Sequence, residues 1–193
     1  MNKFFGHLKT VLVHKWWVFY YCHMVGLTWR GIKHDLSKFS PTEFFESVKY
    51  YTGTDSPINA CKKENGWSKA WQHHKGRNTH HYEYWQDNFD NGGTALVMPF
   101  KDNLEMLCDY LAAGRAYMKD KFTFEAEYKW WRNKISGPIA MHKVNKQFIE
   151  TSLCMLLDSK TDKILKTINF EALYDSIYAG YSIEERMKAC GDK

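Results

Sequence analysis

Apolar residues recur every three or four positions along most of the chain, and this spacing restricts the fold to helices that pack on one another. The period is clearest from Asn2 to about Val25 and from Pro99 or Asp102 to about Lys121, where one face of each helix would be apolar. No segment sustains the alternation of apolar and polar residues that is typical of a strand. We therefore predict an all-α fold.

Capping and turn residues divide the chain further. A short helix is predicted from Trp29 to Lys38, and another over residues 44–51, where the sequence Ser40-Pro41-Thr42-Glu43 has the form of a helix start. Clusters of Gly, Asp, Pro and Asn predict loops over residues 52–65 and 90–93.

Length and turn positions favour one compact domain. A chain of 193 residues suits a single domain. We expect an HD-domain-like helical core over residues 1–134, for reasons given below. After the break at Ser136-Gly137-Pro138, helices at about 139–157 and 162–179 would form a C-terminal extension, residues 135–193, that packs on this core.

Composition excludes several classes of protein. Hydrophobic residues make up 44% and charged residues 25%, the balance of a folded globular protein. Five scattered cysteines without a C-x-x-C pair argue against a disulfide framework or a thiolate zinc site. They favour a location in the reducing cytoplasm. His14, Lys15 and His23 interrupt the longest apolar stretch, so we expect no membrane-spanning helix and no membrane partner.

The formal charge of +5 favours anionic partners. Because the basic residues are spread along the chain, a phosphorylated small molecule explains this charge better than a nucleic acid does.

Histidine is concentrated in the first half of the chain, where eight of nine histidines precede residue 82. His14, the pair His34-Asp35 and Asp109 follow one another on successive predicted segments. Imidazole nitrogen and carboxylate oxygen together suit a divalent transition metal. Apolar residues flank Asp109, and an unpaired carboxylate would be costly there, a cost that a metal ion would remove. Isolated histidines such as His7, by contrast, are expected to be packed or surface residues.

A second histidine group has two interpretations. Its residues are His73-His74-Lys75-Gly76-Arg77-Asn78-Thr79-His80-His81. The aromatic neighbours of this stretch, among them Trp71 and Trp85, are compatible with a solvated or aromatic-packed surface. The alternative is that some of these histidines are further metal ligands.

The order His, His-Asp, Asp resembles the HD-domain superfamily of metal-dependent phosphohydrolases, and the run His34-Asp35-Leu36-Ser37-Lys38 is similar to the His-Asp-Ile-Gly-Lys run of several of its branches. The resemblance implies a helical fold and one or two divalent ions (Mn, Fe, Co, Ni or Zn). It implies that Lys38 contacts the substrate phosphate. The implied metal ligands are His14, His34, Asp35 and Asp109, with His74, His80 and His81 for a second ion.

Three phrases, HDLSKFSPTEF, HHKGRNTHHYEYW and EMLCDYLAAGRAY, also look like an uncharacterised family of phages and Firmicutes, over residues 8 to 120. That resemblance bears on the fold and implies no activity.

The expected function is hydrolysis of a phosphate mono- or diester, with a nucleotide or related small molecule as substrate. The candidate catalytic residues are Lys38, Arg77 and Glu105, and the candidate substrate-binding residues are Lys38, Arg77, Asn78 and Arg115. Three alternatives stay open: a binding protein that sequesters a nucleotide or host factor around a structural metal, a di-iron oxygenase on an HD scaffold, and a nucleic-acid binder.

Overall fold

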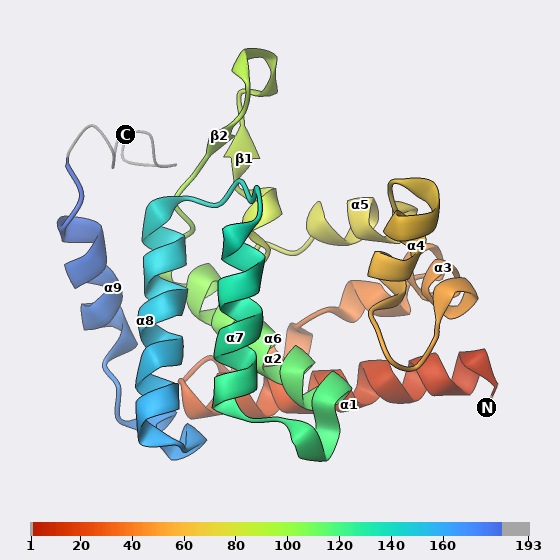
Figure 1. Cartoon of the computed structure of the whole chain (residues 1–193), viewed down its shortest axis with the longest axis horizontal. Helices are drawn as coiled ribbons and strands as arrows, with labels where there is room; N and C mark the ends of the chain where they lie inside the picture. Colours follow the sequence, from red (N-terminus) through yellow and green to blue (C-terminus); the bar gives the residue numbers. More distant parts are fainter. Residues whose placement is uncertain (1, 183–193) are drawn as a thin grey trace. The chain divides into compact units, whose positions relative to one another are not determined.

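A computed structural model describes residues 2–182 and confirms the all-α class (Figure 1). Within these residues the extended structure is one antiparallel pair, β1 (Gln86–Asp87) and β2 (Thr94–Ala95), with Gln86 opposite Ala95. Strands of two residues are too short to show an alternating pattern, which is why the sequence did not indicate them.

The chain divides into two compact units, and this division does not follow the expected boundary at residue 134. The first unit contains Met1–Asn78 and Asp109–Asp120, and the second contains Thr79–Cys108 and Lys121–Lys193. One long helix, α6 (Phe100–Met118), supplies residues to both units.

The first unit is built on α1 (Lys3–Met24), which confirms the predicted N-terminal helix. The other elements of this unit are α2 (Thr28–Lys33), η1 (Leu36–Phe39), α3 (Pro41–Tyr50), α4 (Pro57–Asn65) and α5 (Lys69–Lys75). Helix α1 packs against α2 and α3, and α3 packs against α4 and α5. A Cβ atom on Gly31 of α2 would lie 2.7 Å from Cβ of Cys22 on α1, so only glycine allows this close approach.

Two predictions for this unit are wrong. The helix expected from Trp29 to Lys38 ends at Lys33, because Asp35 takes a left-handed conformation with φ 53° and interrupts it. The loop expected over residues 52–65 contains α4. Pro57 occupies the first turn of α4, where its missing N–H costs nothing, and Gly66 ends the helix with φ 77°.

The predicted start of α3 is confirmed. The side chain of Ser40 accepts a hydrogen bond from the backbone N–H of Glu43, and Pro41 occupies the first helical position. This cap places Glu43 in the first turn of α3, at the end nearest Asp35 in the sequence.

In the second unit α8 (Lys143–Ser159) packs against both α7 (Phe124–Ser136) and α9 (Phe170–Ala179) (Figure 1). Asn145 of α8 is buried; its side chain accepts from the backbone N–H of Met98 and donates to the carbonyl of Leu96. Short 3-10 segments complete the chain: η2 (Tyr82–Tyr84), η3 (Phe89–Asn91), η4 (Lys119–Lys121) and η5 (Asp162–Lys166). None of the helices described between residues 2 and 182 is long and apolar enough to cross a bilayer.

Candidate metal centre

Four buried side chains of the first unit, His14, His34, Asp35 and Asp109, converge on one point, and we call them the His-Asp cluster. His14 comes from the middle of α1, Asp109 from α6, and the pair His34-Asp35 from the break between α2 and η1. The left-handed backbone at Asp35 lets two consecutive residues direct their side chains to the same place, which a continuous helix would prevent.

Lys15 stabilises this break. Its ammonium donates hydrogen bonds to the carbonyl oxygens of Ile32 at 2.7 Å and His34 at 2.8 Å. Carbonyls at the end of a helix have no N–H partner within the helix, and Lys15 supplies one here. The break is therefore held by α1, the helix that also carries His14.

The distances within the His-Asp cluster match those expected around one cation. Nε2 of His14 lies 3.0 Å from Oδ1 of Asp109 and 3.7 Å from Oδ2 of Asp35. Nε2 of His34 lies 3.1 Å from Oδ2 of Asp35 and 3.2 Å from Oδ1 of Asp109. Ligand atoms about 2.1 Å from a common ion stand about 3.0 Å apart at a right angle and about 3.4 Å apart at a tetrahedral angle.

The orientation of His14 also fits a cation. Its Nε2 atom is buried and close to Asp109, yet lacks the alignment of a hydrogen bond with any acceptor. A buried nitrogen in that state is costly, and a bound ion would satisfy it. On these grounds the residues fit a divalent transition metal with nitrogen and oxygen ligands.

Electrostatics keep both carboxylates of the His-Asp cluster ionised. Burial raises the pKa of Asp35, but His34, Lys38 and His74 more than offset this and hold the pKa well below its usual range. Burial likewise raises the pKa of Asp109, and the two cluster histidines lower it well below the usual value.

Lys38 is the basic residue next to the cluster. Its ammonium lies 2.5 Å from Oδ2 of Asp35, and a quarter of its side chain is exposed. Burial lowers the pKa of Lys38, but the carboxylates of Asp35 and Asp109 outweigh burial and raise it. Lys38 is thus a fixed positive charge at the solvent side of the cluster.

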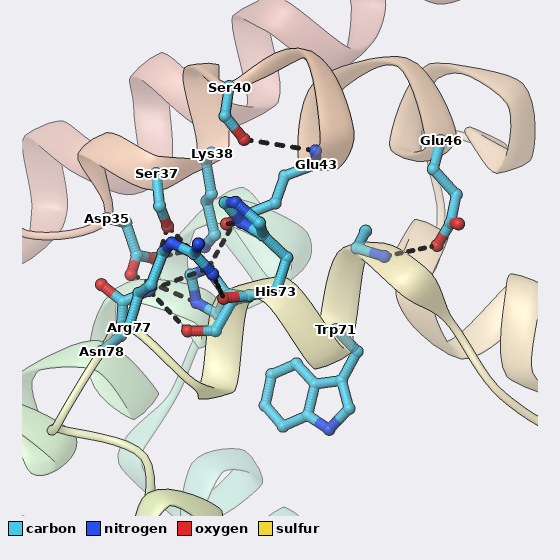
Figure 2. Close-up of polar contacts among 12 residues, drawn as sticks. Asp35, Ser37, Lys38, Ser40, Glu43, Glu46, Trp71, His73, Arg77 and Asn78 are labelled. Carbon is cyan, nitrogen blue, oxygen red and sulfur yellow. Dashed lines mark hydrogen bonds and ion pairs between the residues drawn. The ribbon is translucent and has the colours of Figure 1, made fainter.

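A second group of side chains, which we call the histidine bracket, consists of Glu43, His73 and His74. Figure 2 labels Glu43 and His73. Both carboxylate oxygens of the buried Glu43 are used: Oε1 lies 2.7 Å from Nδ1 of His73, and Oε2 lies 2.7 Å from Nδ1 of His74. An ionised carboxylate only accepts hydrogen bonds, so both Nδ1 atoms carry the proton. The bracket therefore fixes the orientation of two consecutive imidazoles.

The bracket meets the His-Asp cluster at Asp35. Nε2 of His74 lies 3.2 Å from Oδ1 of Asp35, while Oδ2 of the same carboxylate faces His14 and His34. Burial lowers the pKa of His74, but Asp35 and Glu43 outweigh it and raise the pKa to about 9. In the metal-free protein His74 is accordingly an imidazolium between two carboxylates.

A comparison with protein families identifies the chain. Residues 3–155 match the model of a family of unknown function, DUF5662. The chain belongs to the DUF5662 family. The matched segment includes every residue of the His-Asp cluster and of the histidine bracket. No curated protein and no solved structure matches the chain.

Other candidate residues of this DUF5662 protein lie near the bracket. Asn78 donates from its amide to Oγ of Ser37 at 3.0 Å and to the carbonyl of His74 at 2.8 Å, so it ties η1 to the end of α5. Arg77 is exposed, and its guanidinium donates to the carbonyl of His73 at 3.4 Å. Figure 2 shows both residues on the segment at the end of α5.

Arg115 occupies a different place in the first unit. Its Nε donates to the hydroxyl of Tyr21 at 2.9 Å, and the guanidinium lies over the ring of Trp17 at 5.0 Å. These contacts hold Arg115 against α1.

His80, His81 and Glu105 belong to the second unit of this DUF5662 protein. His80 and Glu105 are buried; Nδ1 of His80 lies 3.5 Å from Oε1 of Glu105, and the rings of His80 and His81 are 4.2 Å apart. His74 lies on α5, which ends at Lys75, so the three implied ligands of a second ion, His74, His80 and His81, do not share one helix.

Glu43 is the site residue that the sequence did not reveal. The pattern Ser-Pro-Thr-Glu explained it fully as part of a helix cap, although its side chain reaches the histidines of α5. His73, which is not among the metal ligands that the resemblance implies, lies with its Nδ1 2.7 Å from the same carboxylate.

Proposed function

We propose that the protein is a metal-dependent phosphohydrolase that acts on a phosphate mono- or diester, with a nucleotide or related small molecule as substrate. The observation that carries this proposal is the combination of the buried His-Asp cluster with the cation of Lys38 at its solvent side. The order of the cluster residues and its resemblance to HD-domain phosphohydrolases support the same reaction.

His14, His34, Asp35 and Asp109 would hold the ion, drawn from Mn, Fe, Co, Ni and Zn. What such an ion supplies when bound is Lewis acidity, which makes water a nucleophile near neutral pH. The protein contributes a dry cluster of fixed geometry, since all four side chains are buried and two of them are held ionised.

Lys38 would bind the phosphate of the substrate. Its ammonium is fixed by Asp35 and is partly exposed, so an anionic oxygen arriving from solvent meets a positive charge that is already in position. Such preorganised charge stabilises the extra negative charge that develops during phosphoryl transfer. Arg77 and Asn78, from the segment that follows α5, are the next candidates for substrate contacts.

His74 would extend the site to a second ion. Its Nε2 faces Oδ1 of Asp35, whereas His14 and His34 face Oδ2, so each oxygen of this carboxylate would contact a different ion. Two-ion sites stabilise both the attacking and the leaving oxygen of a phosphoester.

The test is turnover of phosphoesters by the full chain after loading with each of the five metals. A panel of nucleoside monophosphates, cyclic nucleotides and a nitrophenyl phosphodiester covers the substrate class. We expect metal-dependent release of phosphate or alcohol that is lost in Asp109→Asn and reduced in Lys38→Met. Stoichiometric metal without turnover of any member of the panel would reject the hydrolase proposal.

A binding protein with a structural metal is the second candidate, and one observation favours it. Four protein side chains converge on one point, and four protein ligands are typical of closed structural sites, whereas catalytic zinc usually keeps one position for water. Tight binding of a nucleotide without hydrolysis, measured by calorimetry on the metal-loaded protein, would identify this function.

A further inference from the structure

The outer side of α1 carries large apolar residues that the fold does not cover. Leu12 and Trp16 are one turn apart and exposed, and Trp16 retains 59% of its accessible surface. The half-buried ring of Phe19 continues this line, with its centroid 5.9 Å from that of Trp16, and the ring of His23 follows at 6.1 Å from Phe19. The opposite side of α1 contains His14 and Val18, which are buried.

Helix α2 continues the same surface. Nδ1 of His23 lies 3.1 Å from the hydroxyl of Thr28, the residue before Trp29, and Trp29 is 74% exposed. Ile32 is exposed too, and its carbonyl accepts a hydrogen bond from the ammonium of Lys15 on α1. We call this surface the α1–α2 face; its apolar residues are Leu12, Trp16, Phe19, Trp29 and Ile32.

Exposed apolar bulk is concentrated in this part of the chain. Of the fourteen large hydrophobic residues that are exposed in the described part of the chain, eight lie between Phe4 and Phe39, and four of these eight belong to the α1–α2 face. Scattered single residues of this kind need no explanation, whereas a group on two adjacent helices indicates a contact surface.

The basic residues are spread along the chain, but their excess over acidic residues arises in the same segment. Residues 1–34 contain five of the 27 basic residues and none of the 22 acidic residues. The other 159 residues therefore carry 22 of each sign, and the whole formal charge of +5 belongs to the segment that forms the α1–α2 face. Lys9 and Lys33 are exposed beside its apolar residues.

We propose that the α1–α2 face docks on the surface of an anionic lipid bilayer, with Trp16 and Trp29 inserted at the headgroup level and the lysines contacting lipid phosphates. Tryptophan, leucine and isoleucine next to lysine are the residues of helices that lie in the membrane interface. The proposal departs from the expectation, drawn from the sequence, that the protein has no membrane partner. The contact differs from a spanning helix, which the polar residues of the segment exclude. The proposal does not depend on the proposed phosphohydrolase activity.

Two other occupants fit less well. A second copy of the chain would bring two faces of the same positive sign together, without acidic residues to compensate. A nucleic acid would match the lysines but would leave the aliphatic side chains of Leu12 and Ile32 without an apolar partner.

The test is co-sedimentation of the full chain with vesicles of phosphatidylcholine and phosphatidylserine, and with vesicles of phosphatidylcholine alone. We expect binding to the anionic vesicles that weakens at least tenfold in the double variant Trp16→Ala/Trp29→Ala. The double variant Lys9→Ala/Lys33→Ala should lose about 30-fold and approach the binding to neutral vesicles. Trp67→Ala, which removes an equally exposed tryptophan outside the face, is the matched control and should bind as the wild type does.

Circular dichroism and thermal unfolding of each variant separate loss of binding from loss of fold, and the exposed positions predict unchanged folding. Absence of sedimentation with anionic vesicles would overturn the proposal. So would equal loss in the Trp67→Ala control. A wild-type dimer that the tryptophan variant dissociates would make the face an interface between copies, and vesicle-independent binding of single-stranded RNA or DNA would make it a nucleic-acid surface.

Discussion

Replacing Glu43 with Gln removes the negative charge of the histidine bracket while nearly preserving the shape of the side chain. Glu43 accepts two hydrogen bonds of 2.7 Å, from His73 and His74, and it is buried. Glutamine offers one carbonyl oxygen and one NH₂ group, so one of the two Nδ1–H groups would face a donor.

The magnitude follows from these contacts. A hydrogen bond to a charged group contributes about 1.5 to 3 kcal/mol to stability. Because His73 is partly exposed, its hydrogen bond to Glu43 contributes less than that of His74. We therefore expect Glu43→Gln to lower the free energy of unfolding by about 2 to 4 kcal/mol, or the melting temperature by about 4 to 16 °C. Because an outer carboxylate orients a metal-binding imidazole, metal affinity should also fall about 10- to 100-fold.

Glu46→Gln is the matched control. Glu46 lies one turn further along α3 (Figure 2). Its Oε1 accepts from the backbone N–H of Ala70 on α5 at 2.9 Å and from the hydroxyl of Ser68, the residue before α5. This variant should lose stability without any loss of metal affinity. Thermal unfolding with and without metal, and calorimetric titration with Zn²⁺ or Mn²⁺, measure both quantities. Equal metal affinity in the two variants would refute the role assigned to the bracket.

Three further changes have defined outcomes. Lys38→Met should lower kcat/KM about 100- to 1000-fold while the protein binds metal at least as tightly, because the ammonium competes with a cation for Asp35; weaker metal binding would contradict this. In the folded, metal-free protein the pKa of His74 is about 9, above its value of 6.5 in the unfolded chain. The protonated His74 therefore stabilises the folded state by up to about 3 kcal/mol. This stabilisation is complete below pH 6.5 and is lost as the pH rises through 9. Denaturant titrations at several pH values should show this decline in the wild type and not in His74→Gln. Gly31→Ala should cost about 1 to 3 kcal/mol, because its Cβ would collide with Cys22, and an unchanged unfolding midpoint would rule out the close contact of α1 and α2.

Helical periodicity was sufficient to predict α1 and α6, which have long apolar faces and few interruptions. It failed for α4, because the Pro, Gly and Asn residues that indicated a loop are the ones that begin and end that helix. It also failed at His34-Asp35, where the left-handed backbone that separates α2 from η1 has no sequence signature in an aspartate.

The candidate site shows the same contrast. The order of the residues, through its resemblance to the HD-domain pattern, suggested that His14, His34, Asp35 and Asp109 lie together, and they converge in the structure. The bracket was not predictable, because it depends on the packing of α3 against α5, which brings Glu43 to residues thirty positions away. A contact of that kind is set by tertiary structure and leaves no periodic pattern.

Metal content of the untagged protein, measured by elemental analysis after purification and after reconstitution, tests the central claim most directly. The variants are His34→Ala and Asp109→Asn, with Asp102→Asn as the control because Asp102 is another buried aspartate of α6. We predict one to two equivalents of Mn, Fe, Co, Ni or Zn in the wild type and in the control, and a loss of at least one equivalent in both cluster variants. A wild-type protein that neither retains nor regains any of these metals, or cluster variants that keep the full complement, would contradict the assignment of the His-Asp cluster as a metal centre.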